Sequence, residues 1–310
     1  MKVAPIDRRA LPPQAKVTMW RTGDNWPIRR LDWAQQEGRP VRGNLLFANG
    51  RGDFIEKYLE PLAYWHARGW NVASFDWRSQ GGSQGSVRGG HLDSFEDVLS
   101  DFAAFAEDWV QGEGPHVAVG HSMGAHLLLR LLAEHRPALD AAVLVAPMIG
   151  INSSPLPPWL AQQIAQNFTV LGWGKIPVGA QKGKLEEGSL RRKILTSCPE
   201  RYSDELWWLE QRPAYSLGAP SWGWLAAAYR SIASLTAEKL RSVELPVLLL
   251  GTERDRLVSP PAIRWAADLL PHSELMMFSD AGHEILREVD NIRLKALERI
   301  DRFLDEHSGE

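Results

Sequence analysis

Short apolar runs that alternate with helical segments constrain the fold of this chain more than any other feature. Runs rich in Val, Leu and Ala occur at 45–48, 72–75, 116–119 and 141–145. The segments between them repeat apolar residues every three or four positions, most clearly from Phe95 to Trp109. Strands that helices cover on both faces are apolar throughout. The pattern therefore predicts an α/β fold with a mostly parallel central sheet flanked by helices.

This alternation stops after Pro147 and resumes at Leu245. In between, prolines and glycines separate short helical pieces. A strand at 245–250, a helix at 261–270, a strand at 275–278 and a last helix are expected to follow. An insertion of ~90 residues between two strands is too long for a plain loop. We predict a first core part at 1–150, a helical cap subdomain over the strand ends at 151–241, and a second core part at 242–310.

A Gly-x-Ser-x-Gly sequence, Gly120 to Gly124, lies between the apolar run 116–119 and the helical segment 125–134. A serine on a sharp strand-to-helix turn has strained backbone geometry and no room for side chains two residues away on either side. The turn presents the Ser122 hydroxyl at the carboxyl end of the sheet, where a helix N-terminus favours developing negative charge. We predict Ser122 as a nucleophile.

A serine nucleophile needs a histidine as general base and a carboxylate that orients it, in the chain order serine, acid, histidine for this architecture. His283 lies just past the predicted strand 275–278, in a loop at the carboxyl edge of the sheet. His91 is the remaining alternative, because it follows a glycine-rich loop. We predict His283 as the base.

Carboxylates follow the predicted strand 245–250. Asp255 stands four residues past Gly251, where its side chain can turn toward a histidine on the next loop. Glu253 is the near rival, and Asp280 is too close to His283 in sequence to face its ring. We predict Asp255 as the acid of the triad.

Two backbone N–H groups are expected to stabilise the negative oxygen of the tetrahedral intermediate. One belongs to Met123, the residue after the nucleophile. The other comes from the loop after the early strand, and we predict Arg51 as its donor because Gly50 and Gly52 let that backbone turn toward the site.

Several segments of the chain resemble one known group of enzymes. The nucleophile turn contains His-Ser-Met-Gly, and residues 75–81 (FDWRSQG) are similar to the pattern D-x-R-G-Q-G-x-S. Residues 194–197 (ILTS) and 217–224 (LGAPSWGW) look like cap segments of the same group. From about Val17 to Phe303 the chain resembles the α/β-hydrolase superfamily, and within it the serine hydrolases that are similar to lysophospholipase L2 and monoacylglycerol lipase. The resemblance implies the α/β-hydrolase fold with a cap between two strands.

Three functions follow from this resemblance and these residues. The first is hydrolysis of the carboxylic ester of a lipid with one acyl chain, a lysophospholipid or a monoacylglycerol, through an acyl-enzyme on Ser122. The second is a carboxylesterase or thioesterase for small soluble esters, which needs the same chemistry and a different pocket. The third, a ligand-binding scaffold without catalysis, normally lacks a member of the triad.

Tryptophan is unusually frequent, with 14 in 310 residues. Six of them fall within 151–241, so we expect the cap to form an apolar roof over Ser122. The residues predicted to bind the acyl chain are Trp207, Trp208, Trp222 and Trp224. The cap would also offer a route to peripheral contact with a membrane.

The amino-acid composition limits the classes of binding partner and the cellular location that we expect. A net charge of −3 argues against nucleic acid as a partner, and the single cysteine, Cys198, excludes an intrachain disulfide and a thiolate metal cluster. We expect no cofactor and no metal. Residues 1–16 contain no apolar run typical of a signal peptide. A cytoplasmic location is the default expectation, with the cap as the route to the inner face of the membrane, and the sequence leaves the oligomeric state open.

Overall fold

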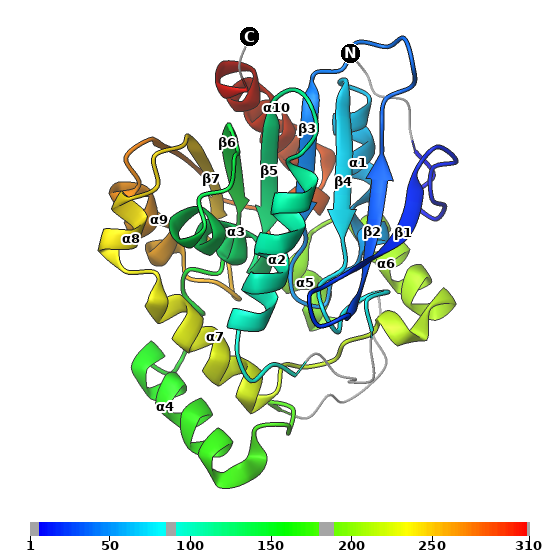
Figure 1. Cartoon of the computed structure of the whole chain (residues 1–310). Helices are drawn as coiled ribbons and strands as arrows, with labels where there is room; N and C mark the ends of the chain where they lie inside the picture. The colour runs from blue at the N-terminus through cyan, green and yellow to red at the C-terminus, as the bar shows by residue number, and fades with distance from the viewer. Residues whose placement is uncertain (1–5, 85–90, 180–188, 309–310) are drawn as a thin grey trace.

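The computed structural model describes residues 6–84, 91–179 and 189–308, built around an eight-stranded sheet (Figure 1). Its strands lie in the order β1-β2-β4-β3-β5-β6-β7-β8. Their bounds are β1 (Lys16–Arg21), β2 (Pro27–Trp33), β3 (Gly43–Ala48), β4 (Trp70–Phe75), β5 (His116–His121), β6 (Ala141–Val145), β7 (Val247–Thr252) and β8 (Ser273–Phe278). The six strands from β3 to β8 are parallel, which confirms the predicted α/β class.

Two antiparallel strands, β1 and β2, were not expected from the sequence. β1 pairs with β2, and β2 pairs with β4, at one edge of the sheet. The side chains of β1 are mostly exposed, and β2 contains Arg29, Arg30 and Asp32. Neither strand therefore shows the continuous apolar run that marks a strand buried on both faces.

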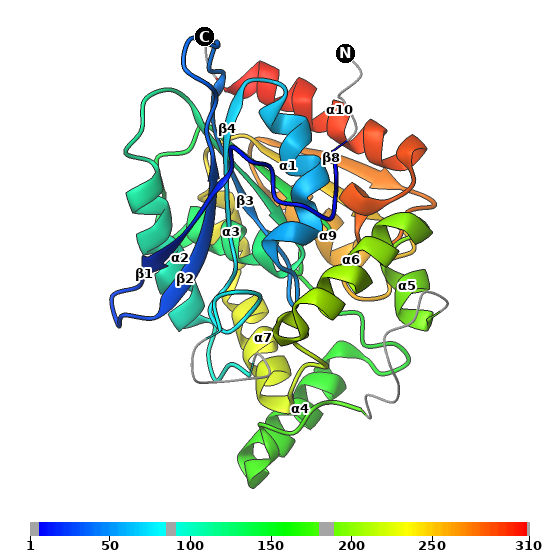
Figure 2. The ribbon, with the colours of Figure 1, turned by 90° about the vertical axis from the view of Figure 1, so that its right-hand side faces the viewer.

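Helices cover both faces of the sheet, as Figures 1 and 2 show. The helices α1 and α10 lie on one face, and α2 and α3 lie on the other. The bounds are η1 (Ile55–Tyr58), α1 (Leu59–His66), α2 (Glu96–Trp109), α3 (Met123–Glu134), α9 (Pro260–Leu269), η4 (Ile285–Arg287) and α10 (Asp290–His307). Each predicted helix outside the insertion is therefore present, with ends within a few residues of those expected.

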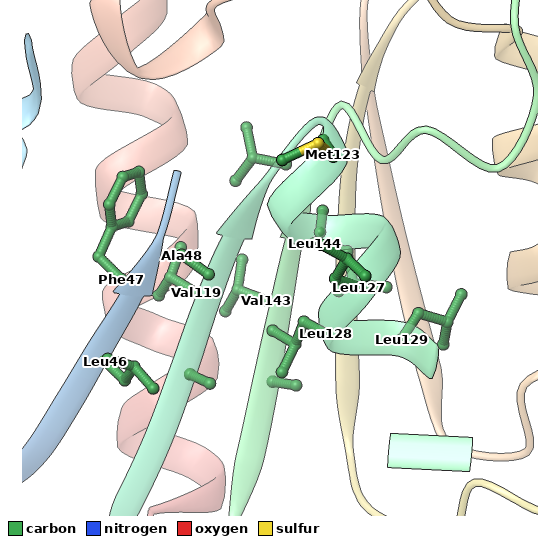
Figure 3. Close-up of a cluster of buried hydrophobic side chains, with 14 of the residues drawn as sticks. Leu46, Phe47, Ala48, Val119, Met123, Leu127, Leu128, Leu129, Val143 and Leu144 are labelled. Carbon is green, nitrogen blue, oxygen red and sulfur yellow. The ribbon is translucent and has the colours of Figure 1, made fainter. Parts of the chain in front are cut away.

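Helix α3 packs directly on the middle of the sheet (Figure 3). Leu128 of α3, Val119 of β5 and Val143 of β6 are completely buried in this cluster. Each such side chain contributes about 1.5–3 kcal/mol on burial. This packing holds the first residue of α3 against the carboxyl ends of the strands, where Ser122 lies.

The segment between β6 and β7, residues 146–246, consists in its described part of short helices joined by loops. It contains α4 (Pro158–Phe168), η2 (Thr169–Trp173), α5 (Leu190–Leu195), α6 (Pro199–Gln211), η3 (Pro213–Tyr215), α7 (Trp222–Ser234) and α8 (Ala237–Arg241). Helices α4 and α7 pack together beyond the carboxyl end of the sheet, at the bottom of Figure 1. The limits of a cap subdomain at 151–241 stay a prediction. No helix among the described residues has both the length and the apolar character to span a bilayer.

Candidate active site

Ser122 occupies the tight turn between β5 and α3. Its φ of 54° and ψ of −115° place it in a conformation that non-glycine residues rarely adopt. A Cβ at Gly124 would lie 2.2 Å from the carbonyl oxygen of Ala48, and a Cβ at Gly120 would lie 2.6 Å from the Cα of Ala125. The predicted need for glycine on both sides of the serine is therefore confirmed.

The structure brings Ser122, His283 and Asp255 into one hydrogen-bonded chain. The Oγ of Ser122 lies 2.9 Å from Nε2 of His283, and Nδ1 of His283 lies 2.8 Å from Oδ2 of Asp255. The other oxygen of Asp255 accepts hydrogen bonds from the backbone N–H groups of Leu257 (2.8 Å) and Val258 (2.9 Å). The carboxylate is thus held on both oxygens, and the imidazole is held on both nitrogens.

Burial and hydrogen bonding shift the pKa values of the two titratable members in opposite directions. Burial favours the neutral carboxyl of Asp255, but His283 and the two backbone N–H groups outweigh it and lower the pKa of Asp255. Burial also favours the neutral imidazole, yet the charge of Asp255 outweighs it and raises the pKa of His283 above 6.5. The pair therefore stabilises an imidazolium, the form that a general base takes after it accepts a proton.

The rival residues lie elsewhere. His91 makes hydrogen-bond contacts with Oγ of Ser221 (2.7 Å) and with Asp93 (3.1 Å), and residues 85–90 of the loop before it lie outside the described residues. Glu253 pairs with Arg264, and Asp280 is exposed. Neither carboxylate has a hydrogen bond to His283 within the described chain.

The loop after β3 lies directly against the nucleophile. A Cβ on Gly50 would lie 3.2 Å from the Cβ of Ser122, so only glycine fits there without displacing it. Within the described residues, the backbone N–H groups of Arg51 and Met123 donate no hydrogen bond to the protein. Both remain available for an oxyanion, as their predicted roles require.

A cavity of about 230 Å³ opens at Ser122 and His283. Its wall is largely apolar on the side that the 146–246 segment and the loop after β7 provide. The apolar residues there are Met148, Ile151, Leu195, Pro220, Trp224, Leu225, Leu257 and Val258. Charged side chains and His121 line the rest. The charged residues are Arg51, Asp53 and Lys57 from the region after β3, Arg191 of α5, and Glu284 next to His283. The cavity is thus amphiphilic.

The four tryptophans predicted to bind the acyl chain have different positions. Trp224 lines the cavity. Trp222 instead stacks on Phe168 of α4, with ring centroids 4.3 Å apart. Trp207 and Trp208 contact each other on α6, and Nε1 of Trp208 donates to the backbone oxygen of Arg8 (2.9 Å). Within the described residues only Trp224 of the four faces this cavity, which corrects the expectation for the other three.

A buried group of charged residues beside the cavity was not recognised in the sequence. Lys57 reaches Asp53 (2.5 Å), Glu284 (2.6 Å) and Glu205 (3.2 Å), and Arg287 pairs with Glu205 (2.9 Å) and with Glu284. Burial opposes both charges, but their pairing lowers the pKa of Asp53 and raises that of Lys57. The i, i+4 spacing of Asp53 and Lys57 and the position of Glu284 beside His283 were the available signals.

One cluster among the described residues has the spacing of metal ligands: Glu274, Glu306 and His307. None of the three lines the cavity, and Glu274 already pairs with Arg299. The cluster is therefore separate from the candidate active site.

The parallel sheet, the nucleophile turn at the end of β5 and the order of the three side chains define an α/β hydrolase of the serine type. A family model described as "Serine aminopeptidase, S33" matches residues 39–290, and the chain belongs to this family.

Similar proteins include two curated relatives. The chain is 30% identical over 275 residues to "Probable lysophospholipase L2" of Haemophilus influenzae, covering 86% of this chain and 85% of the relative. It is also 30% identical over 308 residues to "Lysophospholipase L2" of Escherichia coli (strain K12), covering 92% and 86%. The structure of a soluble variant of monoglyceride lipase from Saccharomyces cerevisiae has a TM-score of 0.76 at 18% identity, covering 98% of this chain and 99% of that one. This structural likeness concerns the fold.

Proposed function

We propose that this protein hydrolyses the carboxylic ester of a lipid with one acyl chain, through an acyl-enzyme on Ser122. The observation that carries the proposal is the hydrogen-bonded chain Ser122–His283–Asp255, which opens into a cavity with a mostly apolar wall. An apolar cavity accommodates an acyl chain, while a few polar groups orient the ester.

The first half of the reaction forms the acyl-enzyme. Oγ of Ser122 attacks the carbonyl carbon while Nε2 of His283 takes its proton, and Asp255 stabilises the resulting imidazolium. The backbone N–H groups of Met123 and Arg51 bind the oxyanion. The C–O bond to the alcohol then breaks, and the proton on His283 passes to the departing oxygen. The acyl group remains on Ser122.

The second half releases the acid. His283 takes a proton from a water molecule, whose oxygen attacks the acyl carbon. The bond between this carbon and Oγ of Ser122 breaks, and His283 returns the proton to Oγ. The net reaction consumes one water and yields one alcohol and one carboxylic acid.

The lipid substrate is favoured over the alternative of small soluble esters or thioesters by the apolar wall of the cavity. The two relatives named as lysophospholipase L2, which are 30% identical over most of their length, point the same way. A non-catalytic scaffold is disfavoured because all three side chains are present and hydrogen-bonded.

We also propose that the outer side of α4 and η2 makes peripheral contact with lipid. Trp159 is 66% exposed, Val170 85% and Leu171 65%. Neighbouring exposed apolar residues on one segment mark a site of interaction with a partner or a membrane. We call Trp159, Val170 and Leu171 the α4 surface.

The test of the proposed function is a series of p-nitrophenyl esters of increasing chain length, measured beside lysophospholipid and monoacylglycerol. In Ser122→Ala we expect kcat to fall by roughly 10⁶-fold, because the acyl-enzyme cannot form. The control Ser234→Ala removes a hydroxyl at the end of α7, outside the cavity, and should behave as wild type. Full activity in Ser122→Ala would contradict the mechanism, and cleavage of acetate without long chains would contradict the lipid substrate.

A further inference from the structure

The side chain of Arg51 lines the cavity and has no carboxylate partner among the described residues. One terminal nitrogen donates to the backbone oxygen of Gly218 (3.1 Å), and the guanidinium lies 5.0 Å from the centre of the Trp224 ring. Its Nε and its other terminal nitrogen are buried, and neither has a hydrogen-bond partner among the described residues. Donors of this kind are destabilising unless something binds them.

The other lysine and arginine of the cavity each have a carboxylate partner, which makes Arg51 different. Lys57 contacts three carboxylates, and Arg191 lies 2.8 Å from Glu205. With the partly exposed Arg191 added, the buried group has three acidic and three basic side chains, namely Asp53, Glu205, Glu284, Lys57, Arg191 and Arg287. The group is therefore neutral, and Arg51 adds a positive charge that no described residue neutralises.

Arg51 keeps its charge at neutral pH. Burial lowers the pKa of its guanidinium, to about 10, which is still well above the physiological range. A planar guanidinium with two free donors matches the oxygens of a phosphate group, which it can bind through two parallel hydrogen bonds. An anion would thus satisfy both orphaned donors and the charge together.

We propose that the Arg51 side chain binds the phosphate of a lysophospholipid substrate and makes the enzyme prefer this lipid to an uncharged monoacylglycerol. The inference rests on the proposed function. The backbone N–H of the same residue is our oxyanion donor, so the ester oxygen and the phosphate would bind at the two ends of Arg51. In Arg51, a short path of covalent bonds joins this N–H to the guanidinium. In the lipid, a path with a similar number of bonds joins the ester carbonyl to the phosphate across the glycerol.

The test compares two lipids that differ only in the phosphate: 1-oleoyl lysophosphatidic acid and 1-oleoylglycerol, each at a low mole fraction in neutral detergent micelles. The readout is the ratio of the two kcat/KM values, in which any common effect on the oxyanion site cancels. In Arg51→Met we expect this ratio to fall by roughly 10- to 100-fold, the range for a lost hydrogen bond to a charged group. Arg51→Lys should recover part of this ratio, because the lysine ammonium still provides a positive point charge.

A matched control removes a positive charge outside the cavity. Arg230 lies on α7, the helix that carries Trp224, but is exposed and contacts the backbone of Asp93. Arg230→Met should leave the ratio unchanged, which separates binding by Arg51 from attraction of a charged micelle. An unchanged ratio in Arg51→Met, with both lipids still cleaved, would overturn the inference and leave the proposed function intact. Failure of the wild-type protein to cleave either lipid would overturn the proposed function itself.

Inhibition experiments separate a lipid headgroup from free phosphate. Glycerol 3-phosphate should inhibit hydrolysis of a short p-nitrophenyl ester, and Arg51→Met should weaken this inhibition at least tenfold. Inorganic phosphate at the same concentration should inhibit much less, because it lacks the glycerol. Equal inhibition by the two compounds would assign Arg51 to free anions and overturn its role in recognising the lipid.

Discussion

Two regions meet at one cavity, and they are built on different principles. The strand-end region supplies Ser122, Asp255 and His283, each directly after or close behind a parallel strand of one sheet. The 146–246 segment supplies Leu195, Pro220 and Leu225 from its helices and loops. Hydrogen bonds join the catalytic side chains of the first region, whereas the second lines the cavity mostly with apolar side chains. We infer that the catalytic side chains and most of the apolar wall for the acyl chain come from separate parts of the chain, while Arg51 in the loop after β3 contributes to both tasks.

The largest effect after loss of the nucleophile is expected from Asp255→Asn in the strand-end region. The amide cannot stabilise the imidazolium of His283 and favours the wrong tautomer, so kcat should fall by roughly 10⁴-fold. Because catalysis needs neutral His283, wild-type kcat/KM should decrease as pH falls through a pKa above 6.5. Without the charge of Asp255, this acidic limb should move to lower pH. A pH profile of both proteins measures both effects.

The control for this change is Glu253→Gln, which alters the neighbouring exposed carboxylate. It should keep the wild-type rate and pH profile. A loss in Glu253→Gln equal to that in Asp255→Asn would show that the wrong acid was assigned.

An intermediate effect is expected from Leu225→Trp in the 146–246 segment. The larger side chain fills part of the cavity of about 230 Å³, so long acyl chains lose space that short ones do not use. We expect kcat/KM for a hexadecanoyl ester to fall about tenfold relative to a butanoyl ester. The same substitution at exposed Leu294 on α10 is the control. If kcat/KM fell equally for both esters, the proposal that the 146–246 segment accommodates the acyl chain would be wrong.

The smallest effect is expected at the α4 surface. In the double variant Val170→Ser, Leu171→Ser, binding to phospholipid vesicles should weaken roughly fivefold to tenfold, since each apolar side chain contributes about 0.5–0.7 kcal/mol when only a small part of it is buried. Hydrolysis of a soluble short ester should not change. Val41→Ser, at another exposed valine, is the control in a vesicle sedimentation assay. Equal binding by the double variant and wild type would place membrane contact elsewhere or remove it.

The sequence predicted the strand-end region better than it predicted the 146–246 segment. The parallel strands could be recognised from their apolar runs. Ser122, Asp255 and His283 could be recognised because each follows such a run and because they occur in the order serine, acid, histidine. Both signals are local in the sequence. β1 and β2 were missed because exposed and charged side chains hide their pattern. The expected roles of Trp207, Trp208 and Trp222 depended on how helices pack, which residue type alone does not reveal.

The sequence by itself determined the alternating architecture and the identity of Ser122, Asp255 and His283, since each follows from periodicity and spacing along the chain. Only the tertiary structure decided which residues of the 146–246 segment face the cavity. It also decided that Lys57 and Arg191 have carboxylate partners, whereas Arg51 has none within the described part of the chain. Whether a charge is neutralised depends on residues far apart in the chain: Lys57 meets Glu205 and Glu284 only after folding. Charge pairing is a property of distances in space, and composition and order alone do not contain it.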